Sequence, residues 1–254
     1  MLETLATPMQ VGEIYAILDE LSPFSLQASW DNSGLNIGSM GQKVDSIALA
    51  LELDSTMAQH LKPNTLLITH HPLLFSPLKS LNTATYPANL IATLLQKNCA
   101  LIAMHTNFDH THLNAHFSRE VLGFSHSIQC DIAQYAPITP IPLEELAAHC
   151  KNALNLPYIR YVSPDNPQTL IKHIYIVCGS GASYAREITT PHSCLICGDV
   201  KYHDAMIAKS NGLSFIDVEH YASEKHFAKI LQSLLQIKNL GATILPNFSP
   251  FSYL

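Results

Sequence analysis

Short buried strands and amphipathic helices alternate along the N-terminal half of the chain, and this alternation limits the possible folds more than any other feature. Runs of apolar residues typical of buried strands occur at 46–53, 66–69 and 100–104. Helices are expected at 10–21, 55–61, 87–97 and 112–122. Strands that are separated by helices favour a mostly parallel sheet flanked by helices, which is an α/β fold.

The segment from 126 to 212 has a second set of predicted elements. A helix at 142–155 has Pro142 in its first turn and Pro157 just beyond its end. Strands are expected at 159–162, 174–177 and 194–197. We therefore predict two domains: a main α/β domain formed by 1–125 plus 213–254, and a smaller α/β (α+β) domain at 126–212 inserted into it.

Composition and charge argue against nucleic-acid binding and against a role at a membrane. The 254 residues are 47% hydrophobic and only 13% charged, which is enough to bury a substantial core. The net charge of -6 and the absence of a basic run disfavour binding to nucleic acid or to an anionic membrane. The N-terminus lacks the basic flank and apolar core of a signal peptide, and no apolar run approaches spanning length. We expect a cytoplasmic protein that does not act at a membrane.

The six cysteines lie apart, mostly in apolar, strand-like contexts where buried reduced thiols are expected. Cys194 and Cys197 form a CxxC pair, but no second pair and no helix start accompany it. We interpret this pair as part of a core strand rather than as a redox or zinc site.

Imidazoles and carboxylates follow three of the expected strands. His70 and His71 come directly after one strand, Asp109 lies shortly beyond the next, and His220 follows a strand-like run at 213–217. In an open parallel sheet, sites lie outside the carboxyl ends of the strands. His220 and Glu224 are four residues apart at the start of a helix expected at 221–236, so both side chains can face the same ion. These placements indicate a metal site.

Each of these residues also has an ordinary interpretation. An Asp after a strand is usually a turn or cap residue, and an isolated His and Glu four residues apart on a helix are usually a surface pair. Periodicity cannot show that the three strands are neighbours. A similar choice concerns the loop at 179–183, whose backbone amides could bind a phosphate. A tight turn that needs glycine is the favoured interpretation there, because the spacing fits no established phosphate motif.

Five motifs in family order resemble the GTP cyclohydrolase 1 type 2 homologue family, whose members are also called Nif-three-like dinuclear-metal proteins. The motifs are WDNSGLNIG at 30–38, ITHHP at 68–72, HTNFD at 105–109, GDVKYHDA at 198–205 and EHYASE at 219–224. The terminal PFSY at 250–253 is also similar, so the resemblance extends from about residue 11 to residue 254.

The resemblance implies a two-metal centre. Its ligands would be His70, His71, Asp109, His220 and Glu224, with Asp109 and Glu224 shared between the ions. The resemblance also places His105 beside the ligands, where an imidazole can orient a ligand or relay a proton, and this makes it the candidate catalytic residue. The candidates for the substrate cleft are Asp31, Asn32, Lys201 and His203. A pair of turn residues at 31–32 and a solvated loop at 201–203 remain the alternatives for these four.

The sequence departs from the family pattern at two places. Small residues usually follow the Asp of the third motif, whereas this chain has His110, Thr111 and His112. We interpret the two histidines as exposed residues at a helix start, with additional site imidazoles as the alternative. The family often has Gly before the His of the last motif, and here that residue is Glu219.

The activity that the resemblance implies is hydrolytic opening of the guanine ring of GTP, with formate release towards 7,8-dihydroneopterin triphosphate. The expected cofactors are two divalent ions per chain, and imidazole and carboxylate ligands suit zinc, iron or manganese equally well. The resemblance also implies self-association as a homohexamer. The alternative is a metal-binding regulatory or storage assembly without turnover. Open coordination positions favour catalysis, because storage sites tend to be closed by protein ligands.

Overall fold

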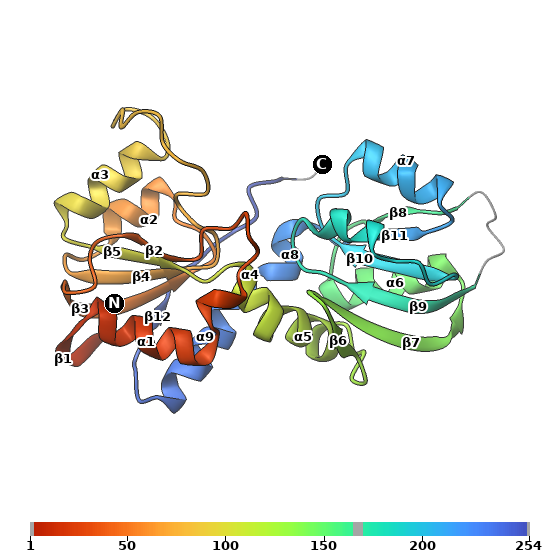
Figure 1. The fold of residues 1–254 in the computed structure, drawn as a ribbon, viewed down its shortest axis with the longest axis horizontal. Helices are drawn as coiled ribbons and strands as arrows, with labels where there is room; N and C mark the ends of the chain where they lie inside the picture. The colour runs from red at the N-terminus through yellow and green to blue at the C-terminus, as the bar shows by residue number, and fades with distance from the viewer. Residues whose placement is uncertain (1–2, 165–169, 253–254) are drawn as a thin grey trace. The chain divides into compact units, whose positions relative to one another are not determined.

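The computed structural model of the chain describes residues 3–164 and 170–252 (Figure 1). The chain divides into two compact units. Unit 1 comprises residues 1–108 and 226–248, and unit 2 comprises residues 109–225 and 249–254. Each unit contains a mixed sheet with flanking helices, which confirms the predicted two-domain α/β fold. The domain boundaries predicted after residues 125 and 212 both fall within unit 2 and stay a prediction.

The sheet of unit 1 has three central parallel strands. Its strands are β1 (Thr4–Gln10), β2 (Gly34–Ile37), β3 (Lys43–Ala50), β4 (Thr65–Thr69), β5 (Ala100–Ala103) and β12 (Thr243–Ile244). The order is β1-β3-β4-β5-β2, and β12 also pairs with β3. The pairs β3–β4, β4–β5 and β3–β12 are parallel, whereas β1 and β2 are antiparallel to their neighbours. The three predicted strands of this region are β3, β4 and β5.

Helices cover both faces of the unit 1 sheet (Figure 1). They are α1 (Val11–Leu21), α2 (Ser55–His60), α3 (Ala88–Gln96), the short α4 (Thr106–Phe108) and α9 (Phe227–Ile237). α2 begins where Asp54 Oδ1 accepts a hydrogen bond from the Met57 amide at 2.7 Å, the usual cap for a helix start. α2 and α3 bury their apolar faces against alternate residues of the strands, among them Ala48, Leu67 and Leu101. Strands buried on both faces explain the unbroken apolar runs in the sequence.

The sheet of unit 2 repeats the pattern of three central parallel strands. Its strands are β6 (Ile128–Cys130), β7 (Ala133–Ile141), β8 (Arg160–Val162), β9 (Ile171–Ile176), β10 (Ser193–Cys197) and β11 (Ser214–Asp217). The order is β6-β7-β9-β10-β11-β8, with β9, β10 and β11 parallel and the remaining pairs antiparallel. Cys194 and Cys197 are both buried in β10, as the core-strand interpretation predicted. Side chains three residues apart on a strand point to opposite faces of the sheet, so Cys194 and Cys197 cannot bind the same ion.

The helices of unit 2 start with a continuous helical segment after Phe108. It comprises a π-helical turn (Asp109–Leu113), α5 (Asn114–His116) and a second π-helical turn (Phe117–Val121). The others are α6 (Leu143–Leu154), a 3₁₀-helix (Gly181–Arg186), α7 (Tyr202–Ser210) and α8 (His220–Glu224). Figure 1 shows α6 and α7 on opposite faces of this sheet. Among the described residues, no helix combines the length and apolar character needed to cross a membrane.

Two expectations from the sequence were wrong. The strand before His220, β11, belongs to the unit 2 sheet and not to the sheet of β4 and β5. Periodicity identifies a strand but carries no information about its distant partners, so this pairing could not be read from the chain. The helix expected at 221–236 is two helices, α8 and α9, and the chain passes from unit 2 to unit 1 between Lys225 and His226.

Candidate metal centre

Unit 1 gathers three histidines at the carboxyl ends of its parallel strands. β4 and β5 pair with Thr69 opposite Ala103, so both strands end at the same edge of the sheet. His70 and His71 directly follow β4, and His105 follows β5. Within this group, one ligand atom of each histidine lies within 4.8 Å of those of the other two. Neutral imidazoles at this separation are suitable ligands for a transition metal ion.

His70 is held in one orientation. Its side chain is fully buried, its ring lies 5.0 Å from the ring of Phe227, and its Nδ1 donates a hydrogen bond to the carbonyl of Met104 at 2.8 Å. A carbonyl can only accept, so Nδ1 carries the proton and Nε2 carries the lone pair in the neutral ring. A backbone carbonyl commonly fixes the tautomer of a metal-binding histidine in this way.

His105 is oriented by a buried carboxylate. Its Nδ1 donates to Asp31 Oδ1 at 2.8 Å, while Asp31 Oδ2 accepts from Ser33 Oγ at 2.9 Å and from the Thr106 amide at 3.1 Å. Burial by itself would raise the pKa of Asp31, but the hydrogen bonds from His105, Thr106 and Ser33 outweigh burial and hold that pKa well below its ordinary value. The side chain of Asp31, a predicted cleft residue, is fully buried. Its charged carboxylate therefore orients His105.

The other predicted cleft residues have different surroundings. Asn32 Nδ2 donates to the carbonyl of Leu74 at 2.5 Å and ties two loops together. Lys201 and His203 lie at the start of α7 in unit 2, and both are exposed. His110 and His112 are half-buried within the first π-helical turn, rather than exposed at a helix start. Burial lowers the pKa of His112, whose Nδ1 lies 2.7 Å from Thr111 Oγ1.

Unit 2 builds its part of the candidate set in the same way, beyond the ends of β9, β10 and β11. His220 Nδ1 lies 2.7 Å from Asp199 Oδ2, and His220 Nε2 lies 2.9 Å from Glu224 Oε2. If Nδ1 donates to Asp199, the neutral ring presents a lone pair to a carboxylate at 2.9 Å. Two acceptors this close require a proton or a metal cation between them, so the donor set fits a cation.

Gly179 makes room for Glu224. A Cβ atom at Gly179 would lie 2.0 Å from Glu224 Oε1 and 3.4 Å from His220 Nε2, and the glycine φ of +61° is also unfavourable for other residues. The Gly179 amide donates to Ser223 Oγ at 2.9 Å. The absence of a side chain at Gly179 lets Glu224 approach the backbone closely. This supports the tight-turn interpretation of the 179–183 loop over a phosphate-binding loop.

Asp109 is the remaining candidate ligand in unit 2. It is buried in the π-helical turn that opens the unit. Burial first, and then the charges of Asp109 and Glu224, raise the pKa of the fully buried Cys178 thiol. Both carboxylates are thus close enough to the Cys178 thiol to raise its pKa. Buried His, Asp and Glu side chains of this kind could bind a metal ion.

Two acidic residues near the histidines were not predicted from the sequence. Glu52 follows β3, and its Oε2 lies 3.6 Å from Nδ1 of His71. Asp199 follows β10 and pairs with His220. Both residues follow the carboxyl end of a parallel strand, as His70 and His220 do. A search for polar residues after every parallel strand would therefore have found them.

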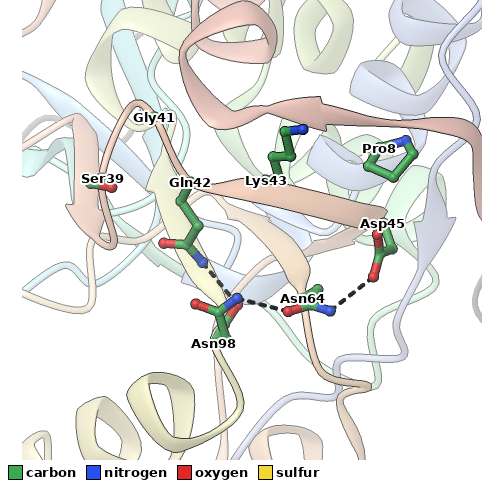
Figure 2. Close-up of a pocket in the computed structure, with 8 residues that line it drawn as sticks. All are labelled: Pro8, Ser39, Gly41, Gln42, Lys43, Asp45, Asn64 and Asn98. Carbon is green, nitrogen blue, oxygen red and sulfur yellow. Dashed lines mark hydrogen bonds between the residues drawn. The ribbon is translucent and has the colours of Figure 1, made fainter.

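A polar hollow of about 490 Å³ lies at the opposite, amino ends of β3, β4 and β5 (Figure 2). Its residues bind one another: Asn98 Nδ2 donates to Asn64 Oδ1 at 2.7 Å, and Asn64 Nδ2 donates to Asp45 Oδ2 at 2.9 Å. These bonds link the turns before β4 and β5 to the first residues of β3. The hollow is separate from His70, His71 and His105 of the same unit, which lie at the carboxyl ends.

Comparisons with known proteins agree with these features. A model of the family described as Duf34/NIF3 (NGG1p interacting factor 3) matches residues 9–247. A Helicobacter pylori protein named GTP cyclohydrolase 1 type 2 is 45% identical over 234 residues, which cover 92% of this chain and 95% of that protein. A Campylobacter jejuni protein named GTP cyclohydrolase 1 type 2 homolog is 39% identical over 245 residues, 96% of this chain and 100% of that protein.

Solved structures share the fold. A Staphylococcus aureus hypothetical protein superposes with a TM-score of 0.79 at 26% identity, over 98% of this chain and 100% of that one. A Bacillus cereus protein related to NIF3 has a TM-score of 0.80 at 16% identity over the same shares, which is a likeness of fold alone. From the family match over 9–247 and the identity to its relatives, the chain belongs to the Duf34/NIF3 family.

Proposed function

We propose that this chain is a metal-dependent hydrolase of the GTP cyclohydrolase 1 type 2 kind. It would open the guanine ring of GTP at C8 and release formate, towards 7,8-dihydroneopterin triphosphate. The observation that carries the proposal is the cluster of His70, His71 and His105, which offers three imidazoles within 4.8 Å in a chain 45% identical to a protein of that name. The substrate follows from the names of the relatives alone.

The proposed centre holds two divalent ions. The residues that would hold them are those that the family resemblance implies: His70, His71, Asp109, His220 and Glu224. The fixed tautomer of His70 and the space that Gly179 leaves for Glu224 support this set. Ions of zinc, iron or manganese would each suit these nitrogen and oxygen donors.

Such ions supply a hydroxide nucleophile at neutral pH and stabilise a developing oxyanion. The contribution of the chain is proton transfer by His105. With its Nδ1 proton donated to Asp31, the ring has Nε2 free to take a proton from attacking water and to return it to the departing ring nitrogen. A buried carboxylate that stays ionised also stabilises the imidazolium formed in between.

Metal content and formate release, measured on the same sample purified without chelator, test the proposal. We expect about two ions per chain and formate from GTP. His71→Ala and Glu224→Ala should lose metal while the fold, followed by circular dichroism, is kept. His126→Ala, at an exposed histidine outside the set, is the matched control. Unchanged metal in both ligand variants contradicts the ligand set.

The same experiment separates the proposal from the alternative without turnover. Bound metal with no formate release would point to a metal-binding regulatory or storage assembly. Self-association as a homohexamer belongs to the proposal, and light scattering after size-exclusion chromatography tests it. A monomer under the assay conditions would contradict that part alone.

A further inference from the structure

Two aromatic side chains of unit 1 are exposed next to the histidine cluster. Trp30 is 61% exposed and Phe75 is 52% exposed. Their ring centroids are 5.9 Å apart with an interplanar angle of 48°, and each centroid lies 6.1 Å from that of His105. Exposed apolar residues that stand alone are common on proteins. A tilted aromatic pair beside the clustered imidazoles of His70, His71 and His105 is a more specific arrangement.

The backbone that carries the pair is anchored. Asn32 Nδ2 donates to the carbonyl of Leu74 at 2.5 Å, and the Leu74 amide donates to Asn36 Oδ1 at 3.2 Å. These bonds join the loop of Trp30 to the loop of Phe75. Asp31, directly after Trp30, is itself fixed by its bonds to Ser33 and His105. The backbone beside the two residues is therefore fixed, while their rings stay exposed.

The chemistry of the pair selects a flat ligand. Aromatic faces stack well on planar heterocycles such as nucleic-acid bases. The rings next to the pair are imidazoles: His105 touches both aromatic residues, and the His71 ring centroid is 5.7 Å from that of His105. A ring stacked on the pair would lie beside the groups proposed to carry out the hydrolysis.

We propose that Trp30 and Phe75 form an aromatic platform that stacks the purine base of the nucleotide substrate beside His105. This inference rests on the proposed function, because it gives the base of that substrate its binding site. The platform recognises the ring system and leaves the triphosphate to other parts of the chain. Trp30 and Phe75 are positioning residues, while His105 acts on protons.

The chain provides its own probe, because Trp30 is its only tryptophan. GTP is titrated into the metal-loaded protein, with excitation at the red edge of the indole absorption, where guanine absorbs little. We expect saturable quenching by GTP and none by inorganic tripolyphosphate, which has the charges without the ring. Phe75→Ala should raise the dissociation constant for GTP about tenfold, because the substitution removes one stacking contact. Tyr161→Ala, at an aromatic 44% exposed on β8, is the control and should change nothing.

Formate release, measured alongside, separates failure of the platform from failure of the function. Formate release with no change in Trp30 fluorescence, or equal quenching by tripolyphosphate, overturns the platform and leaves the hydrolase standing. Trp30→Ala should raise KM for GTP about tenfold, and an unchanged KM also overturns the platform. Saturable quenching by GTP without formate release supports the platform and overturns the hydrolase. If GTP causes neither quenching nor formate release, both the platform and the hydrolase are overturned.

Discussion

His105 and Asp31 are 74 residues apart in the chain, yet Nδ1 of His105 lies 2.8 Å from Oδ1 of Asp31. The carboxylate oxygen fixes which nitrogen of the ring carries the proton. The proton-relay capacity proposed for His105 therefore depends on a residue from a different loop.

Asp31→Asn should lower the free energy of unfolding by about 1–3 kcal/mol at neutral pH, because an amide cannot accept all the bonds that the carboxylate accepts. The pKa of Asp31 is depressed in the folded protein, so its stabilisation is complete above the ordinary value near 4 and is lost as the pH falls below it. The difference between wild type and variant in urea unfolding should thus shrink from pH 7 to pH 3. Asp45→Asn, which affects a carboxylate with a bond to Asn64, is the control and should show a smaller effect. A constant difference across this range would contradict the assignment.

Gly179→Ala should release metal. The added methyl carbon would lie 2.0 Å from Glu224 Oε1, so the carboxylate must move. Gly212→Ala is a matched control, because its φ of +74° carries a similar backbone cost while nothing lies within 4 Å of the added carbon. Elemental analysis should show metal loss in the first variant only. Equal metal content in the two variants would mean that Glu224 does not hold the ion.

Glu219→Gly should stabilise the protein by about 1 kcal/mol or more. Glu219 has φ of +66° and ψ of 147°, a region where glycine is favoured, and its buried Oε1 has no hydrogen-bond partner among the described residues. The glycine that the family often has at this position would relieve both costs. Thermal unfolding measures the change. Asn239→Gly, at a φ of +58° that asparagine tolerates well, should have little effect.

The thiols should differ in reactivity. Cys130 is half-buried, and the other five cysteines are buried. Burial raises the pKa of Cys150 to about 12 and raises that of Cys178 as well. Ellman's reagent should therefore react rapidly with about one thiol in the native protein and with all six in denaturant. Fast reaction of several native thiols would contradict the packing of β10 and α6.

Local patterns predicted much of the fold and part of the candidate site. Apolar runs followed by polar residues identified β4 and β5, and His70 and His71 were selected because they follow a strand end, whereas His105 was selected through the family resemblance. The sheet to which β11 belongs could not be predicted, because strand pairing depends on contacts between distant residues. The strand-end rule could have found Glu52 and Asp199 but not their roles, since an acidic residue after a strand has the same local pattern whether it ends a turn or orients a histidine.

The unit 2 sheet is bordered by β6 and β8, which are three residues long each. Strands this short present few free backbone amides and carbonyls, and the part of β7 that extends beyond β6 contains Pro137 and Pro140, which have no amide hydrogen, so these borders are poor templates for the strand of another molecule. Copies of this chain that assemble are therefore expected to meet through side chains on helices and loops rather than by extending this sheet. That mode of contact would leave the parallel strands, and the residues at their carboxyl ends, undisturbed by assembly.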